Sequence, residues 1–307
     1  MKDKLPIDDV LQDLLQAVRA HGCAVLQAPP GAGKTTRVPL ALLQASIVQG
    51  RIVMLEPRRL ATRAAAERLA QQLDESVGET VGYRMRGETK VSKQTRVEVV
   101  TEGILTRMIQ SDPELTGIGA VIFDEFHERS LNADLGLALT LEVREALRPD
   151  LIIIVMSATL DAGPVADLVN APTITSQGRA HTVEHRWLDR PLRKEDQFET
   201  VVADLVAQAV GETKGGVLVF LPGEGEIRRV HSRLHARLPS DCSVRPLYGA
   251  LPYSDQRAAI APFTSGRKIV LSTSIAETSL TIEDIRVVVD CGKSRRARFD
   301  PGSGMSR

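Results

Sequence analysis

Short apolar runs rich in β-branched residues recur along the whole chain, and they limit the fold more than any other feature. Several are apolar at every position, as in Ile152-Ile-Ile-Val-Met156, and do not alternate with polar residues. Such runs are typical of strands that are covered on both faces, as in parallel sheets. The predicted strands are residues 23–27, 51–56, 97–101, 120–124 and 151–156 in the first half, and 216–222, 243–248, 268–273 and 285–290 in the second half.

The stretches between these runs have helical character. Residues 62–73 and 227–238 carry apolar side chains every three or four positions among charged ones, which predicts helices. Strands that alternate with helices predict two successive α/β domains, each with a mainly parallel sheet flanked by helices. Helical character is lost in Ala171-Pro-Thr-Ile-Thr-Ser-Gln-Gly178, so we place the boundary at residue 177. The expected domains are residues 1–177 and 178–307.

A glycine-rich loop, Gln27-Ala-Pro-Pro-Gly-Ala-Gly-Lys-Thr-Thr36, directly follows the first predicted strand. It matches the phosphate-binding pattern G-x-x-x-x-G-K-[ST] except for Ala28 at the first glycine. Backbone amides of such a loop hold phosphate oxygens, the lysine reaches the β- and γ-phosphates, and the Thr35 hydroxyl ligates Mg²⁺. A merely flexible turn would explain the glycines but not the Lys-Thr pair. The predicted nucleotide-binding residues here are Gly31, Ala32, Gly33, Lys34, Thr35 and Thr36.

Two adjacent acids, Asp124 and Glu125, end the apolar run 120–124. The carboxyl ends of parallel strands meet at one edge of a sheet, so the acids should lie near the glycine-rich loop. Asp124 can then hold hydrated Mg²⁺, and Glu125 can deprotonate the water that attacks the γ-phosphate. A pair of solvated acids is the alternative, and the loop upstream disfavours it. The predicted metal ligands are Thr35, Asp124 and Glu125.

Composition narrows the class of protein. Lys plus Arg and Asp plus Glu both total 39, so any nucleic-acid surface must be a local basic patch. The three cysteines show no paired spacing, which favours a reduced cytoplasmic protein over a disulfide scaffold. No run approaches the ~20 apolar residues of a membrane span. Trp187, the single tryptophan, is expected to pack in a core or at the domain boundary.

With Asp124-Glu-Phe-His127, the chain resembles a superfamily 2 helicase of the DEAH/DExH class, and within it the bacterial HrpB type. Further segments resemble the motifs of that family in the family's order. They are Leu55-Glu-Pro-Arg-Arg-Leu60, Thr101-Glu-Gly103, Ser157-Ala-Thr159, Leu218-Val-Phe-Leu-Pro222 and Ser272-Thr-Ser-Ile-Ala-Glu-Thr-Ser-Leu-Thr281. The resemblance implies two tandem RecA-like domains that use ATP and Mg²⁺ to move along a single strand of nucleic acid. It favours RNA over DNA, and it implies a monomer.

The resemblance also implies roles for single residues. The catalytic set is Lys34, Asp124, Glu125 and His127, and Arg68 would stack on the adenine. Ser157, Thr159 and Glu277 would couple nucleotide state to movement. The residues implied to contact the sugar-phosphate backbone are Arg58, Arg59, Thr101, Thr273 and Thr278. Such contacts position a strand without reading its sequence, and the 3% of aromatic residues suits that mode better than base stacking. For Arg58, Arg59 and His127, the residues alone leave a solvated helix start and a satisfied histidine as open alternatives.

Two departures from the family pattern bear on function. Phe126 replaces the usual alanine, while the acids and the histidine keep their register. The chain also ends at Ser303-Gly-Met-Ser-Arg307, before the family's arginine-rich motif VI. An arginine finger supplies about 10³–10⁵ in rate in other phosphoryl-transfer enzymes, so we expect a fragment that binds ATP but hydrolyses it slowly. The alternatives are a nucleotide-gated nucleic-acid-binding module with little turnover, and a P-loop ATPase of transport or metabolism.

Overall fold

The chain forms two compact α/β units. The computed structural model describes residues 4–158, 163–178, 182–193, 195–263, 265–277, 282–295 and 299–306. Its internal contacts divide the chain into unit 1, Met1–Val183, and unit 2, Glu184–Arg307. The domain boundary predicted at residue 177 lies just before this division and stays a prediction.

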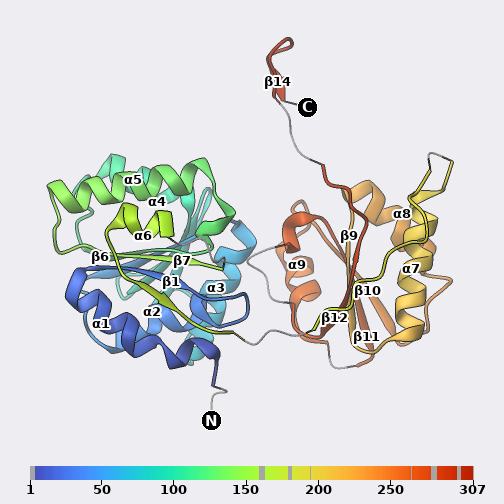
Figure 1. The fold of residues 1–307 in the computed structure, drawn as a ribbon, viewed down its shortest axis with the longest axis horizontal. Coiled ribbons are helices and arrows are strands. Elements are labelled where there is room, and N and C mark those ends of the chain that lie inside the picture. Colours follow the sequence, from blue (N-terminus) through green and yellow to red (C-terminus); the bar gives the residue numbers. More distant parts are fainter. Residues whose placement is uncertain are drawn as a thin grey trace. The chain divides into compact units, whose positions relative to one another are not determined.

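Unit 1 is an eight-stranded sheet with helices on both faces (Figure 1). The strand order is β4-β3-β5-β2-β6-β7-β1-β8, and in the described part of this unit β4 alone runs antiparallel to its neighbour. In chain order the elements are η1 (Pro6–Asp9), α1 (Leu11–His21), β1 (Cys23–Gln27), α2 (Lys34–Gln44), β2 (Arg51–Glu56), α3 (Arg59–Gln72), β3 (Val81–Met85), β4 (Glu88–Lys90), β5 (Val97–Thr101), α4 (Glu102–Ser111), β6 (Ile118–Phe123), η2 (Phe126–Glu128), α5 (Leu131–Ala146), β7 (Ile152–Ser157), α6 (Gly163–Val169) and β8 (Thr173–Thr175).

Two hydrophobic cores, one on each face of this sheet, explain why its central strands are apolar at every position. Ile122 packs with side chains of α1, α2 and α3, whereas its neighbour Phe123 packs with α4, α5 and α6. Successive side chains of a strand point to opposite faces, so a strand between two helix layers needs apolar residues throughout. Every residue of β6 and of β7 is buried. The predicted covering of both faces is confirmed.

Unit 2 has a four-stranded parallel sheet in the order β10-β11-β9-β12 (Figure 1). Its elements are α7 (Phe198–Glu212), β9 (Gly216–Phe220), α8 (Glu224–Leu234), β10 (Cys242–Leu247), α9 (Tyr253–Ile260), β11 (Arg267–Ser272), η3 (Ser274–Ala276) and β12 (Ile285–Asp290), followed by the hairpin strands β13 (Phe299–Asp300) and β14 (Met305–Ser306). Helices α7 and α8 cover one face over a core that includes Val206, Val219 and Leu271. Burial alternates along β12, the edge strand.

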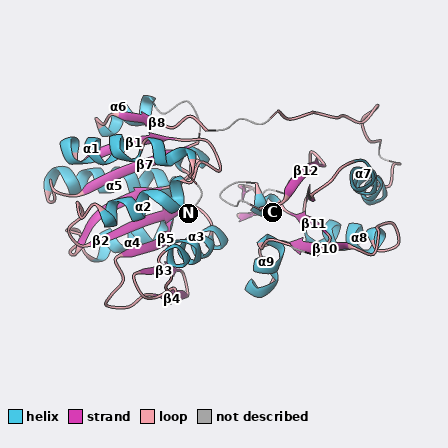
Figure 2. Cartoon of the chain, turned by 90° about the horizontal axis from the view of Figure 1, so that it is seen from below, coloured by secondary structure: helices cyan, strands magenta, loops and turns pink. Residues whose placement is uncertain are grey.

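The nine predicted strands are all present, and the structure adds short ones that the sequence did not reveal. Predicted strands 23–27, 51–56, 97–101 and 285–290 match the observed bounds, and the others differ by one or two residues at one or both ends. Strands β3, β4, β8, β13 and β14 are not among the nine predicted strands. The core position predicted for Trp187 is wrong, because its side chain is 88% exposed. It lies among the described residues 182–193, which form no helix or strand. Figure 2 draws the described part of the connection between β8 and α7 as loop. No helix among the described residues is long and apolar enough to cross a bilayer.

Candidate active site

Five neighbouring strands of unit 1 bring the predicted site residues to one edge of its sheet. In the spatial order β5-β2-β6-β7-β1, the strands end at or just before Thr101, Glu56, Asp124 and Ser157, and the last leads into the glycine-rich loop. Because β7 separates β6 from β1, Asp124 lies one strand away from the loop. Ligands of parallel sheets bind at this carboxyl edge.

The glycine-rich loop turns sharply into α2. Gly31 and Gly33 have φ angles of 77° and 95°, in the left-handed region that favours glycine. A Cβ on Gly33 would lie 2.6 Å from Leu5 Cδ1. The loop is fixed by backbone bonds, since Ala28 donates to the Ser157 carbonyl and Ile7 donates to the Ala32 carbonyl. Helix α2 begins at Lys34, so its first amides and its positive end face the loop.

Four side chains converge beside this loop. Lys34 Nζ lies 2.7 Å from Glu125 Oε1, and the Thr35 hydroxyl donates to Asp124 Oδ2 over 2.5 Å. The other oxygen of Asp124 accepts the amide of Glu125 at 2.8 Å. Lys34 is 4% exposed and Asp124 5%. The expected meeting of loop and acids at one edge is therefore present. Thr36 lies one residue further, with its hydroxyl 3.3 Å from the Gly33 carbonyl.

The buried charges shift one another's proton affinity. Burial alone would lower the pKa of Lys34, but the carboxylates of Asp124 and Glu125 raise it above its ordinary value. Burial raises the pKa of Glu125, and the neighbouring Asp124 charge adds to that rise, while Lys34 opposes it. A carboxylate with a raised pKa is a stronger base. Glu125 is therefore suited to accept a proton.

Glu56, at the end of β2, is a site residue that sequence reasoning missed. Its side chain is 2% exposed and is hydrogen-bonded to Asp124. Burial raises its pKa well above the ordinary value, and the charges of Asp124 and Glu125 raise it further. Its Oε2 has no hydrogen-bond partner among the described residues. The signal that found Asp124, an acid ending an apolar run, is also present in residues 51–56.

His127 lies in η2, directly after the acids. Its Nε2 is 3.3 Å from Glu125 Oε2, and its Nδ1 accepts the amide of Ala158 at 3.2 Å. Burial lowers the pKa of the imidazole, and the charge of Lys34 lowers it further. His127 therefore joins Glu125 to Ala158, which directly follows the buried Ser157 at the end of β7. Thr159 lies outside the described residues.

The residues implied to contact nucleic acid lie in both units, as do the residue implied to stack on adenine, Arg68, and the coupling residue Glu277. Arg58 is paired with Glu128 at 3.3 Å, and Arg59 donates to the Arg86 carbonyl at 2.7 Å. Thr101 is the N-cap of α4, and Arg68 is exposed on α3. In unit 2, Thr273 and Glu277 flank η3. Thr278 lies outside the described residues.

The donors beside the loop fit a magnesium ion. Thr35 and Asp124 offer a hydroxyl and a carboxylate within hydrogen-bond distance of each other. Mg²⁺ prefers oxygen ligands and is usually held by one or two carboxylates together with substrate phosphates. No group of three or more His, Cys, Asp or Glu side chains in the described residues is arranged to hold a metal by itself. The site therefore suits an ion that arrives with a nucleotide.

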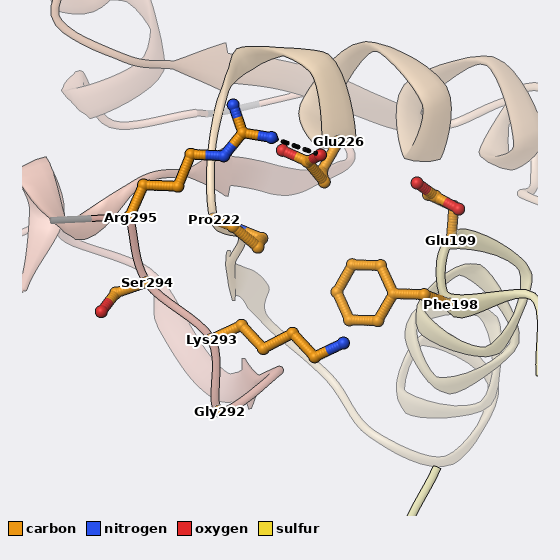
Figure 3. A pocket seen from close by; sticks show the side chains of 8 residues that line it. All are labelled: Phe198, Glu199, Pro222, Glu226, Gly292, Lys293, Ser294 and Arg295. Carbon is orange, nitrogen blue, oxygen red and sulfur yellow. Dashed lines mark hydrogen bonds and ion pairs between the residues drawn. The ribbon is translucent and has the colours of Figure 1, made fainter. Parts of the chain in front are cut away.

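Unit 2 has a hollow of about 630 Å³ at the carboxyl ends of β9 and β12 (Figure 3). Its cations already have partners. Lys293 Nζ lies 4.6 Å from the centre of the Phe198 ring, and Arg295 is paired with Glu226 at 3.1 Å. Glu199, Pro222, Gly292 and Ser294 complete the lining. The hollow belongs to a different unit from the Lys34 and Asp124 cluster, so we do not assign it to the phosphate chemistry.

A parallel α/β sheet with a glycine-rich loop after one strand and an acidic pair after a nearby strand is the arrangement of P-loop nucleoside triphosphatases. Comparison with known families identifies the group within that class. The DEAD/DEAH box helicase family matches residues 9–168, and the helicase conserved C-terminal domain matches residues 199–301. The chain belongs to the DEAD/DEAH box helicase family.

Similar proteins include two helicases of Escherichia coli strain K12. The ATP-dependent RNA helicase HrpB is 53% identical over 99% of this chain, and the ATP-dependent RNA helicase HrpA is 38% identical over 97% of it. The chain spans 38% of the HrpB relative and 23% of the HrpA relative. A crystal structure of the E. coli DEAH/RHA helicase HrpB superposes with a TM-score of 0.92 and 53% identity, over 99% of this chain and 39% of that one. The expected family and its two α/β units are confirmed.

Proposed function

We propose that this chain is an ATP-dependent motor that couples ATP hydrolysis to movement along single-stranded RNA. One observation carries the proposal: beside the glycine-rich loop, a chain of hydrogen bonds joins Lys34 to Glu125, the Glu125 amide to Asp124, and Asp124 to Thr35. That combination matches the chemistry of phosphoryl transfer from ATP. The relatives named as ATP-dependent RNA helicases support the choice of RNA.

Binding of the nucleotide rests on the loop and α2. The amides at the start of α2, with Gly31, Ala32 and Gly33, hold the phosphates, and Lys34 neutralises the β- and γ-phosphates. Thr36 extends the loop into the helix, and Arg68 on the exposed side of α3 stacks on the adenine. Thr35 and Asp124 hold Mg²⁺, with Glu125 beside them. The bound ion would neutralise charge that develops on the phosphates.

Hydrolysis needs a base near the γ-phosphate. Glu125 takes the proton of the attacking water, because its buried carboxylate has a raised pKa and a neighbouring lysine to fix its orientation. Lys34 and His127 hold the two carboxylate oxygens of Glu125 in place. The change from bound ATP to bound ADP is passed on through the segments that carry Ser157, Thr159 and Glu277.

The sugar-phosphate backbone of the RNA strand is contacted by Arg58, Arg59 and Thr101 of unit 1 and by Thr273 and Thr278 of unit 2. Arg59 is 56% exposed, so its charge is accessible to a phosphate. We place this activity in a monomer in the cytoplasm. Cys23, Cys242 and Cys291 are free thiols, which suits a reducing compartment.

Steady-state ATP hydrolysis, measured with and without poly-U RNA, tests the proposal. The wild-type chain should hydrolyse ATP, and the RNA should raise the rate. Glu125→Gln should keep its affinity for a fluorescent ATP analogue and lose about 10²–10⁴ in turnover, because the base is gone. Glu142→Gln, the same change at an exposed position of α5, is the matched control and should behave as wild type.

Other outcomes point to other functions. RNA binding that depends on an ATP analogue, without hydrolysis, would identify a nucleotide-gated binding module. Hydrolysis without binding to any single strand would identify a P-loop ATPase of another kind. Undiminished hydrolysis by Glu125→Gln would show that another group is the base.

A further inference from the structure

The turn that carries the catalytic residues is strained at both ends. Glu125 precedes η2 with a φ of 50°, and Arg129 follows it with a φ of 46°. Residues with a Cβ rarely adopt this left-handed conformation, which persists only where surrounding contacts fix it. The position of Glu125 therefore depends on the contacts that hold η2.

Four contacts fix this turn and the residues beside it. His127 accepts the Ala158 amide, and Arg129 pairs with Asp134 through two hydrogen bonds. The Ser130 hydroxyl donates to Glu102 over 2.5 Å. Glu128 is paired with Arg58 at 3.3 Å. The partners Arg58 and Glu102 are distant in sequence and start two other helices, α3 and α4.

The Arg58–Glu128 pair is the contact that a nucleic acid can compete for. Arg58 is the N-cap of α3 and is 27% exposed, while Glu128 is 16% exposed. Such a half-buried pair is less screened by salt than one on the open surface. A backbone phosphate carries the same charge as the Glu128 carboxylate and matches the guanidinium fork equally well.

In this arrangement both carboxylate oxygens of Glu125 have a partner. Lys34 holds its Oε1 at 2.7 Å and His127 lies 3.3 Å from its Oε2. Each carboxylate oxygen can accept a second hydrogen bond, but the two contacts fix the directions in which its remaining lone pairs point. The contacts that fix η2 therefore also keep Glu125 in its paired position.

We propose that Glu128 is a positioning residue: through its ion pair with Arg58 it restrains Glu125, and an RNA phosphate that binds Arg58 releases that restraint. The inference rests on the proposed function and deepens it, because it names the contact through which the strand stimulates hydrolysis. The strained turn η2 is the element with two conformations, one that restrains Glu125 and one that releases it. Binding of the RNA strand shifts the equilibrium between them.

The test compares ATP hydrolysis at saturating ATP with and without poly-U RNA. Glu128→Gln should raise the rate without RNA by about two- to fivefold, the shift that a partly exposed ion pair supplies. The stimulation by RNA should fall by the same factor, while affinity for a fluorescent ATP analogue stays unchanged. Glu128→Asp keeps the charge and should restore much of the stimulation. Asp150→Asn, which breaks the separate Arg148–Asp150 pair, is the matched control and should leave both rates unchanged.

A double-mutant comparison shows whether Glu128 acts through Arg58. Arg58→Ala should also raise the rate without RNA, and the double variant should rise no further than either single one. RNA affinity should fall in Arg58→Ala and not in Glu128→Gln, because the second variant keeps the phosphate contact.

Each outcome has one meaning. A wild-type chain that hydrolyses ATP with RNA stimulation, beside a Glu128→Gln variant of equal basal rate and stimulation, overturns this inference alone. Equal losses in both rates of Glu128→Gln also overturn it, since the residue would then only support the fold. A wild-type chain without any hydrolysis overturns the proposed function and this inference together.

Discussion

Glu56 places a third carboxyl group beside Asp124 and Glu125, close to the buried Lys34. Three carboxyl groups around Lys34 cannot all ionise without excess negative charge in a buried site. Burial is the largest cause of the raised pKa of Glu56, and the two other acids add to it. Glu56 is thus the carboxyl group of the three that holds a proton most readily, and in its protonated form it can donate to Asp124. Its hydrogen bond orients the proposed magnesium ligand.

Replacement of Glu56 should change how stability depends on pH. The folded chain binds the Glu56 proton more tightly than the unfolded chain does, so wild-type stability is lost as pH rises above the ordinary glutamate pKa of about 4.3. Glutamine cannot ionise and can donate the same hydrogen bond. Glu56→Gln should therefore gain stability relative to wild type as pH rises from 5 to 8, with a slope of at most about 1.4 kcal/mol per pH unit.

Urea unfolding in the presence of a chelator measures this difference. Glu145→Gln, at an exposed position of α5, is the control and should show no gain that grows with pH. A stability difference between Glu56→Gln and wild type that stays constant from pH 5 to 8 would contradict the assignment of Glu56 as the protonated group.

Local patterns identify some of these residues and miss others for a physical reason. Lys34 and Asp124 could be predicted as neighbours because each follows an apolar strand, and parallel strands end at one edge. The environment of Glu56 depends on β2 lying between β5 and β6. A short stretch of sequence does not determine the order of strands in a sheet. Arg58 and Glu128 are 70 positions apart, so their pairing appears only in the folded chain.

At the scale of elements, the connection from β1 to α2 requires its glycines to different degrees. Gly31 and Gly33 both have a left-handed φ, but only a Cβ on Gly33 meets a neighbour, Leu5. Gly33→Ala should lower the free energy of unfolding by about 1–3 kcal/mol, from backbone strain and displacement of Leu5. It should also weaken ATP-analogue binding.

Gly31→Ala is the matched variant within the same loop. It carries backbone strain without a contact within 4 Å of the added Cβ, so its loss should be smaller. Chemical denaturation of both variants gives the comparison. An equal loss would mean that the contact with Leu5 contributes nothing.

Strands could be predicted where the apolar run is long and were missed where it is short or interrupted. The run 51–56 is apolar because β2 lies inside the sheet, so its bounds were recovered. Strand β4 is a short exposed strand at the sheet edge, and β8 at the other edge has three residues. Edge strands need few apolar residues, which leaves little periodicity to read. In β3, Gly82 and Arg84 interrupt the run.

At the scale of the whole molecule, each unit has its own core. Two cores fill unit 1 and a third fills unit 2. The described residues 182–193, which precede α7, form no helix or strand, and Trp187 lies among them with 88% of its side chain exposed. Exposed segments between compact units are preferred sites of proteolysis.

Limited digestion with trypsin should therefore cut first at Arg186 or Arg193. The expected products are two fragments that resist further digestion, because each retains a core. Mass spectrometry identifies the cut, and acrylamide should quench Trp187 in the native chain almost as well as in urea. A first cut inside a helix or strand, or a protected tryptophan, would contradict the separation into two units.

The amino-terminal segment, Leu5 to Ile7, packs against the glycine-rich loop. Ile7 bonds to Ala32, Leu5 contacts Gly33, and the Pro6 carbonyl accepts the Ser176 hydroxyl at 3.1 Å. An affinity tag or fluorophore fused just ahead of this segment would consequently lie close to the glycine-rich loop. Nucleotide titrations on tagged protein would then report the tag together with the loop, so the label should be cleaved before any dissociation constant is taken.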